Sequence, residues 1–276
     1  MDQRHVTDID IPAVPSGMQT ALHAVQMPVI TQLFIERILF EMCRVPAEKT
    51  FIQRIARPHP GKCLLAGCGK QEEPAEDFVV SAAVCGPLET LDPTMNTDVG
   101  AESLLSTLFE GLMRMRDDGA GKAVAVAGIA KEYIEEKNYD DTVTYTFTLR
   151  SAARWSDGER VTAEDFVYAW QRLVDPATAS PNASLLSMVA GYDEVRETGD
   201  KTKLQVSAKD ESTFVVTLSA PCAYFIEGIC TAVATMPLRR DLTEDGAGFD
   251  MPNVVSNGAY HVSAWSKSSK LTAVRN

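Results

Sequence analysis

Six cysteines and four histidines are the residues of this 276-residue chain with the greatest capacity for covalent or metal chemistry. No two cysteines form a Cys-x-x-Cys pair, and no histidine stands at zinc-ligand spacing from a cysteine. Three histidines fall within the first 59 residues, which leaves only His261 for the longer C-terminal part. We therefore expect no catalytic residue, no metal site and no cofactor, and an enzyme is the least supported class of function.

Three cysteines are interpreted as buried free thiols, because unpaired cysteine is among the most buried residue types. They are Cys85, Cys222 and Cys230. If Cys222 and Cys230 lay on one helix, they would stand about 12 Å apart along its axis, too far for a disulfide.

Gly119-Ala-Gly-Lys122 has the composition of a phosphate-binding loop but not its spacing. Neither the hydroxyl residue after the lysine nor the earlier glycine of such a loop is present. The string instead predicts a glycine turn between a helix and an irregular segment. The acidic pairs Asp117-Asp118 and Asp140-Asp141 also fall in expected turns, where solvated charge is the simplest interpretation.

The string Leu64-Leu-Ala-Gly-Cys68 resembles a bacterial lipobox, in which the cysteine is lipidated, and a polar tether follows it. The stretch 51–63 just upstream carries basic residues and two prolines, unlike the apolar part of a signal peptide. Two interpretations stay open. Either Cys68 is a lipidation site and residues 1–63 arise from a shifted frame or misplaced start, or the match is chance and the chain stays in the cytoplasm.

Short-range patterns predict the elements around these residues. The apolar run 78–84 predicts a strand, and a turn-rich loop runs from Gly86 to Asp98. Asp98 is expected to cap a helix with Glu102 in its first turn. The apolar stripe of that helix is Leu104, Leu105, Leu108, Phe109 and Leu112.

The clearest strand is 143–150, where apolar residues alternate with threonines and an arginine. Thr162 and Asp165 form a capping box for a helix that ends at Asp175-Pro176. Further along, 183–189 predicts a short helix and 213–218 a strand, and Tyr260–Ala264 and Lys270–Val274 predict a hairpin. Without a regular βαβ repeat, the fold class is α/β in the mixed α+β sense.

The net charge of −12 is unevenly distributed. Residues 1–68 carry a net +1 and residues 69–276 a net −13. Because an acidic body repels phosphate backbones, no nucleic-acid partner is expected.

An ordered set of strings resembles family 5 of the bacterial extracellular solute-binding proteins. It comprises Thr90–Pro93, Leu108–Leu112, Tyr145–Arg150, Arg154–Gly158, Val161–Phe166, Phe214–Leu218 and Ser256–Tyr260. The strings Val167–Arg172 and Val174–Pro181 resemble the oligopeptide-binding branch, which serves ABC importers. The resemblance covers about residues 78–276.

The resemblance implies a periplasmic-binding-protein type II fold, here incomplete: part of lobe I plus its inserted α/β domain. It divides the chain into an atypical leader (1–67), a flexible tether (68–77), a first segment of lobe I (78–109), the inserted domain (110–257) and a truncated return into lobe I (258–276). It also implies an extracytoplasmic protein, anchored as a lipoprotein or periplasmic, that acts as a monomer with an oligopeptide ligand and an ABC permease in the membrane.

In relatives the loop after the Asp-Pro string lines the peptide site, so the resemblance makes Thr97 and Val99 candidate ligand contacts. Asn182 is the third candidate, at a position where a relative has a ligand-contacting tyrosine. Trp155 and Trp170 are expected in the core. Since the resemblance stops before a second lobe, we expect this portion to bind peptide weakly alone. The alternative is a non-binding remnant or a stand-alone interaction module built on the inserted domain.

Overall fold

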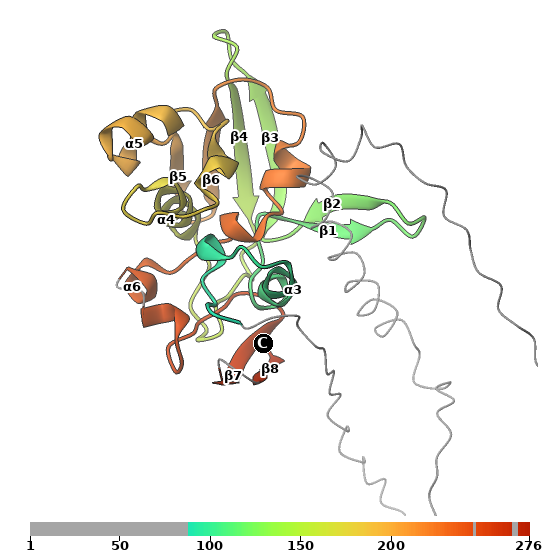
Figure 1. The fold of residues 1–276 in the computed structure, drawn as a ribbon. Helices are drawn as coiled ribbons and strands as arrows, with labels where there is room; N and C mark the ends of the chain where they lie inside the picture. Colours follow the sequence, from blue (N-terminus) through green and yellow to red (C-terminus); the bar gives the residue numbers. More distant parts are fainter. Residues whose placement is uncertain (1–87, 245–246, 267–269) are drawn as a thin grey trace, which may run out of the picture.

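The computed structural model describes residues 88–244, 247–266 and 270–276 (Figure 1). The lipobox with Cys68, the tether, Cys85 and the predicted strand at 78–84 lie outside the described residues. Within the described part, no helix is both long enough and apolar enough to cross a membrane.

The central element is a four-stranded antiparallel sheet in the order β3-β4-β6-β5. Its strands are β3 (Ala130–Lys137), β4 (Val143–Leu149), β5 (Val206–Asp210) and β6 (Thr213–Leu218). Strand β4 alternates buried and half-buried residues along its whole length, which confirms the strand predicted from its sequence pattern. Phe147 and Phe214 are paired across β4 and β6, and both are fully buried.

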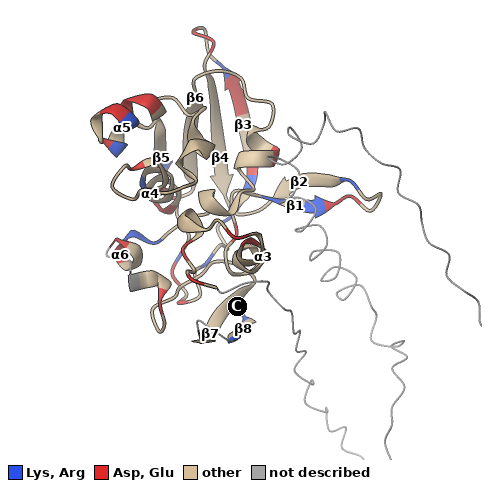
Figure 2. Cartoon of the chain, in the orientation of Figure 1, with Lys and Arg blue, Asp and Glu red and all other residues tan. Residues whose placement is uncertain are grey.

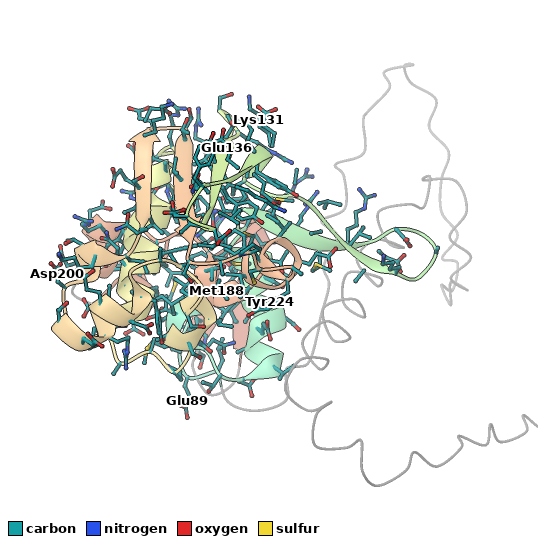
Figure 3. All side chains as sticks on the ribbon, turned by 90° about the horizontal axis from the view of Figure 1, so that it is seen from above. Glu89, Lys131, Glu136, Met188, Asp200 and Tyr224 are labelled. Atoms are coloured by element: carbon teal, nitrogen blue, oxygen red, sulfur yellow. The ribbon has the colours of Figure 1, made fainter. Side chains whose placement is uncertain are left out.

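Strand β3 forms an exposed edge of this sheet. All of its residues after Ala130 are exposed, and five of the seven are charged: Lys131, Glu132, Glu135, Glu136 and Lys137. Figure 3 labels two of these side chains, and Figure 2 shows acidic residues on β3 and on α5 (Tyr192–Thr198). Charged side chains on an edge strand disfavour pairing with another chain.

Helix α4 (Ala163–Val174) packs against the sheet through its apolar face. Trp170 is fully buried, makes an edge-to-face contact with Phe214 at 5.2 Å between centroids, and donates from Nε1 to the carbonyl of Thr235 at 2.9 Å. Asp165 accepts from the backbone N–H of Thr162 at 2.8 Å, which is the carboxylate half of the predicted capping box. The core positions predicted for Trp155 and Trp170 are confirmed.

A hairpin of β1 (Met113–Asp117) and β2 (Ala123–Ala127) projects from the body (Figure 1). The predicted glycine turn at Gly119–Ala123 is confirmed. The elements predicted on either side of it, a helix and an irregular segment, are wrong, because two strands flank the turn. Gly119 and Gly121 have φ of 87° and 86°, and both backbone N–H groups donate to Asp117 Oδ1. The side chain of Asp117 organises the turn, as solvated charge in a loop often does.

Helix α3 (Val99–Leu108) begins as predicted, with Asp98 accepting from Ala101 N at 2.8 Å. It ends four residues earlier than the apolar stripe suggests. Phe109 has extended backbone, so Phe109 and Leu112 are buried by the chain beyond the helix and not by a helical face. The hairpin of β7 (Tyr260–Ser266) and β8 (Lys270–Arg275) lies below α3 in Figure 1, as predicted from its alternation.

The remaining elements are single turns. The helix predicted at 183–189 is only a 3-10 turn at Ala183–Leu186, and by Val189 the chain forms an antiparallel bridge with Leu218. The short elements are η1 (Pro93–Met95), η2 (Ala183–Leu186), η3 (Lys201–Lys203), the π-helical turn η4 (Phe225–Ile229), η5 (Val233–Thr235), α6 (Arg240–Thr243) and η6 (Ala247–Phe249).

Candidate functional site

Thr97 lies in the loop that leads into α3, and Val99 is the first residue of that helix. Thr94 is fully buried and Asn96 is half-buried, whereas Thr97 and Val99 are exposed, Val99 by 41%. Asn96 and Asp98 have extended backbone, and Thr97, Asp98 and Val99 are exposed one after another. The first part of the loop, up to Asn96, therefore holds to the body, and the three residues from Thr97 to Val99 face the surface.

The anchor at the start of the loop is Asp92, of which 4% is exposed. Its Oδ1 accepts from Thr94 N at 2.9 Å and from Thr94 Oγ1 at 2.7 Å. Arg172 of α4 contacts both carboxylate oxygens, with Nη1–Oδ1 at 3.2 Å and Nη2–Oδ2 at 2.7 Å. Arg172 also donates to Thr94 Oγ1, and its guanidinium lies 5.2 Å from the centre of the Phe249 ring.

The second anchor is supplied by the turn after α4. Ser180 Oγ donates to the carbonyl of Thr94 at 2.6 Å. Asn182 Nδ2 donates to the same carbonyl at 3.2 Å and to the carbonyl of Asn96 at 2.8 Å. The three residues named from the sequence are thus brought to one loop, but the Asn182 amide faces the loop backbone.

Sequence reasoning missed the residues that hold this loop, Asp92, Arg172 and Ser180. A signal for one of them exists, since Arg172 is a charged residue between the buried helix positions Trp170 and Leu173. An arginine on the buried side of a helix requires a partner, because an unpaired buried charge is costly. The identity of that partner, 80 residues earlier, is not visible in the spacing.

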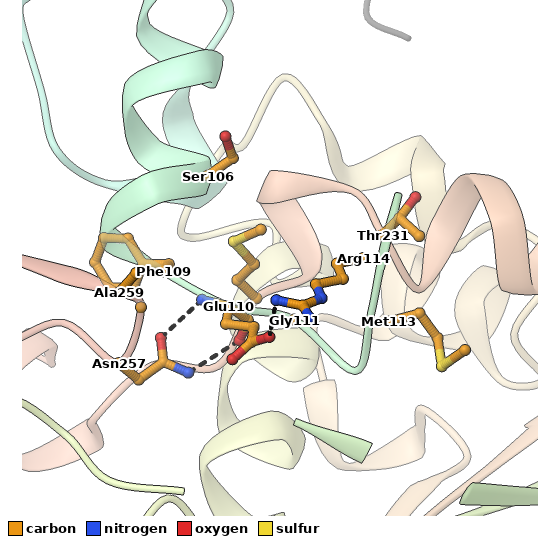
Figure 4. Close-up of a pocket in the computed structure, with 11 residues that line it drawn as sticks. Ser106, Phe109, Glu110, Gly111, Met113, Arg114, Thr231, Asn257 and Ala259 are labelled. Atoms are coloured by element: carbon orange, nitrogen blue, oxygen red, sulfur yellow. Dashed lines mark hydrogen bonds and ion pairs between the residues drawn. The ribbon is translucent and has the colours of Figure 1, made fainter. Parts of the chain in front are cut away.

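A pocket of about 230 Å³ lies between α3, the start of β1 and residues 257–259 (Figure 4). Asn257 donates from Nδ2 to the carbonyl of Glu110 at 2.9 Å and accepts at Oδ1 from Glu110 N at 3.1 Å. Arg114 Nη1 lies 3.6 Å from Glu110 Oε1. Burial raises the pKa of the Glu110 carboxyl, and the guanidinium groups of Arg114 and Arg150 offset part of that rise. The polar side chains of this pocket already have hydrogen-bond or ion-pair partners within the protein, so it is a weaker candidate site than the loop.

The two described cysteines are both free. Cys230 is buried, as predicted, and burial raises the pKa of its thiol well above the usual value. Cys222 is only half-buried, so its predicted burial is wrong: it lies in the irregular segment before the π-helical turn, where less chain covers it. Among the described residues, no group of three or more His, Cys, Asp or Glu side chains could hold a metal ion.

The fold matches that of periplasmic peptide-binding proteins. The structure of Haemophilus influenzae OppA in complex with RPPGFSPFR superimposes with a TM-score of 0.61 at 36% identity, over 68% of this chain and 36% of that one. The family model described as bacterial extracellular solute-binding proteins, family 5 Middle, matches residues 125–276. The chain belongs to this family, which confirms the resemblance found in the sequence.

Two curated relatives show how much of such a protein the chain represents. The periplasmic oligopeptide-binding protein OppA of Escherichia coli K12 is 39% identical over 195 residues, 68% of this chain and 34% of the relative. The probable deoxycholate-binding periplasmic protein YgiS of the same organism is 36% identical over 191 residues, again 34% of its length. The chain therefore spans about a third of the length of these relatives.

Proposed function

We propose that the chain is part of the peptide-binding component of an ABC-type oligopeptide importer and works outside the cytoplasm. The observation that carries the proposal is the anchored loop at 92–99, which presents Thr97 and Val99 to the surface. The similarity to periplasmic oligopeptide-binding proteins supplies the ligand class. Hydrogen bonds to the backbone of an extended peptide would allow the protein to bind peptides of different sequence, because every peptide presents the same backbone groups.

The proposed roles of the three residues differ. Thr97 offers a hydroxyl and Val99 an apolar side chain, and both are exposed enough to contact a ligand. Asn182 is proposed to act mainly through the loop, because its amide donates to the carbonyls of Thr94 and Asn96. We expect weak peptide binding by this chain, since an open surface leaves the ligand and its hydrogen bonds in contact with water.

The finer assignments are part of the same proposal. Lipid attachment at Cys68, a monomeric state and docking on a membrane permease fit an importer component. The proposed domain limits place 78–109 and 258–276 in lobe I and 110–257 in the inserted domain. The hydrogen bonds between Glu110 and Asn257 support those limits, because they tie together the two ends of the proposed insertion.

The test is a nuclear magnetic resonance titration of the ¹⁵N-labelled chain with trialanine, carried to millimolar concentration so that weak binding is visible. The expected result is a saturable shift of the Thr97 and Val99 amide signals, reduced at least several-fold in Val99→Asp. The matched control is Val274→Asp, because Val274 has a similar exposure of 43% against 41% for Val99.

A parallel titration with deoxycholate separates ligand classes within the family. Shifts at the loop with trialanine and none with deoxycholate support the peptide assignment. Shifts with deoxycholate alone would replace the peptide with an amphipathic acid as the ligand. An unchanged spectrum with both would refute a ligand site at this loop.

A further inference from the structure

The loop that carries Thr97 and Val99 is fixed to helix α4 by one buried ion pair. The side chains of Arg172 and Asp92 are 16% and 6% exposed. The other described ion pairs of Arg and Lys with Asp and Glu each have at least one partner more than a third exposed. Surface pairs contribute little to stability or order, whereas a buried, two-armed pair holds both partners in one geometry.

We propose that Arg172 is a positioning residue of the proposed ligand site, which sets the conformation of residues 92–97 and so the placement of Thr97. The proposal rests on the proposed function for its meaning, but the physical contact it invokes is independent of any ligand. Arg172 does not itself reach the exposed surface of the loop; it acts through Asp92 and Thr94.

The contacts transmit that constraint one residue at a time. Arg172 fixes the carboxylate of Asp92, and Asp92 Oδ1 then accepts from the backbone N–H and the hydroxyl of Thr94. The carbonyl of Asp92 also accepts from Met95 N at 3.2 Å. Both the side chain and the backbone carbonyl of Asp92 therefore hold the turn at Pro93–Met95 by hydrogen bonds.

Beyond this turn the constraint continues to the helix. The Asn96 carbonyl is held by Asn182, and Asn96 Oδ1 accepts from Asp98 N at 3.2 Å. Asp98 in turn caps α3. Thr97 therefore lies between two fixed neighbours, and its position follows from theirs.

Arginine suits this role for a geometric reason. A guanidinium presents parallel N–H groups that match both oxygens of a carboxylate, and its flat face can stack on an aromatic ring. Arg172 uses both properties, toward Asp92 and toward Phe249. A lysine would keep the charge but offer one ammonium in place of the two-armed contact.

The experiment measures amide hydrogen exchange at Thr94 and Met95 together with the melting temperature. The variants are Arg172→Met, Arg172→Lys and the double variant Asp92→Asn/Arg172→Met. The control is Arg160→Met, which breaks an exposed ion pair with Glu211 of 3.0 Å. A single Arg172→Met leaves a buried carboxylate unpaired and lowers global stability, whereas the double variant removes both charges and should regain most of it.

The expected result is a loss of protection at Met95 of about tenfold or more in all three Arg172 variants, because loss of the charge-assisted contact between Arg172 and Asp92 lets the turn open and release the Met95 N–H from the Asp92 carbonyl. The melting temperature of the double variant should stay near that of the parent chain, and Arg160→Met should change neither quantity. Protection unchanged in the double variant and in Arg172→Lys would overturn the proposal. So would protection that recovers in step with the melting temperature, which is the behaviour of a purely structural pair.

The titration with trialanine distinguishes a failure of the proposed function from a failure of the positioning role of Arg172. If the parent chain shows no trialanine shift at the loop while Met95 protection depends on Arg172, the ligand assignment is wrong and the positioning contact stands. If trialanine shifts the Thr97 signal equally in the parent chain and in the double variant, Arg172 does not position the site.

Discussion

The side chain of Asn257 makes two hydrogen bonds with the backbone of Glu110, although 147 residues separate the two in sequence. Its amide nitrogen donates to the Glu110 carbonyl at 2.9 Å, and its amide oxygen accepts from the Glu110 N–H at 3.1 Å (Figure 4). One side chain therefore satisfies the donor and the acceptor of a residue that has left helix α3 and has not yet entered β1. This contact closes the segment 110–257 at its base.

Asn257→Ala should lower the free energy of unfolding by about 2 kcal/mol, because it leaves a part-buried N–H and C=O of Glu110 without their partner. Chemical denaturation of the chain measures this change. The matched control is Asn138→Ala, which removes an amide that bonds Thr142 and Thr144 in an exposed turn. A loss at Asn257 no larger than that at Asn138 would contradict a closing role for this contact.

Gly258→Ala should be destabilising by about 1–3 kcal/mol, as overpacking of a close backbone contact usually is. Gly258 N donates to the carbonyl of Leu108 at 2.7 Å, and an added Cβ would stand 2.6 Å from backbone atoms of Thr107 and Leu108. Thermal unfolding checks the change. Gly228→Ala is the control, since its added Cβ would meet only the Tyr224 side chain, at 3.4 Å. Equal melting temperatures for the two variants would count against the close approach.

Glu110→Gln should alter the pH dependence of stability. Burial raises the pKa of the Glu110 carboxyl in the folded chain above its value in the unfolded chain. The contribution of this group is therefore fully present below the unfolded value, near 4.5, and is lost as the pH rises through the folded pKa. Relative to Glu110→Gln, the parent chain should lose stability as the pH rises above about 4.5.

Urea unfolding at several pH values measures that difference. Glu164→Gln serves as its control, because Glu164 is exposed in the first turn of α4. A parent chain that gains stability over Glu110→Gln as the pH rises would show that the attraction of Arg114 and Arg150 outweighs burial.

Cys222 and Cys230 should differ in reactivity toward iodoacetamide. The thiolate is the reactive form, and Cys230 is buried with a raised pKa while Cys222 is partly exposed. Peptide mapping of the native chain at pH 8 should find Cys222 alkylated and Cys230 protected, and both alkylated after denaturation in guanidinium. Equal labelling in the native state would mean that the π-helical turn opens readily.

The sequence by itself determined the elements whose causes are local. The alternation of β4, the Asp98 cap of α3, the Asp165 carboxylate at the start of α4 and the end of α4 before Pro176 all depend on residues within a few positions of one another. Such spacing fixes hydrogen bonds and side-chain direction before any distant contact forms. The family could also be identified, since its strings are ordered along the chain.

Only the tertiary structure decided which residues act together. Strand β3 is charged along most of its length and has no strand pattern of its own; it is a strand because β4 supplies its hydrogen-bond partners. Asp92 meets Arg172, and Glu110 meets Asn257, across 80 and 147 residues. A sequence records that a buried charge or a chain turn needs a partner, but distance in space is set by packing, and packing alone selects which partner it receives.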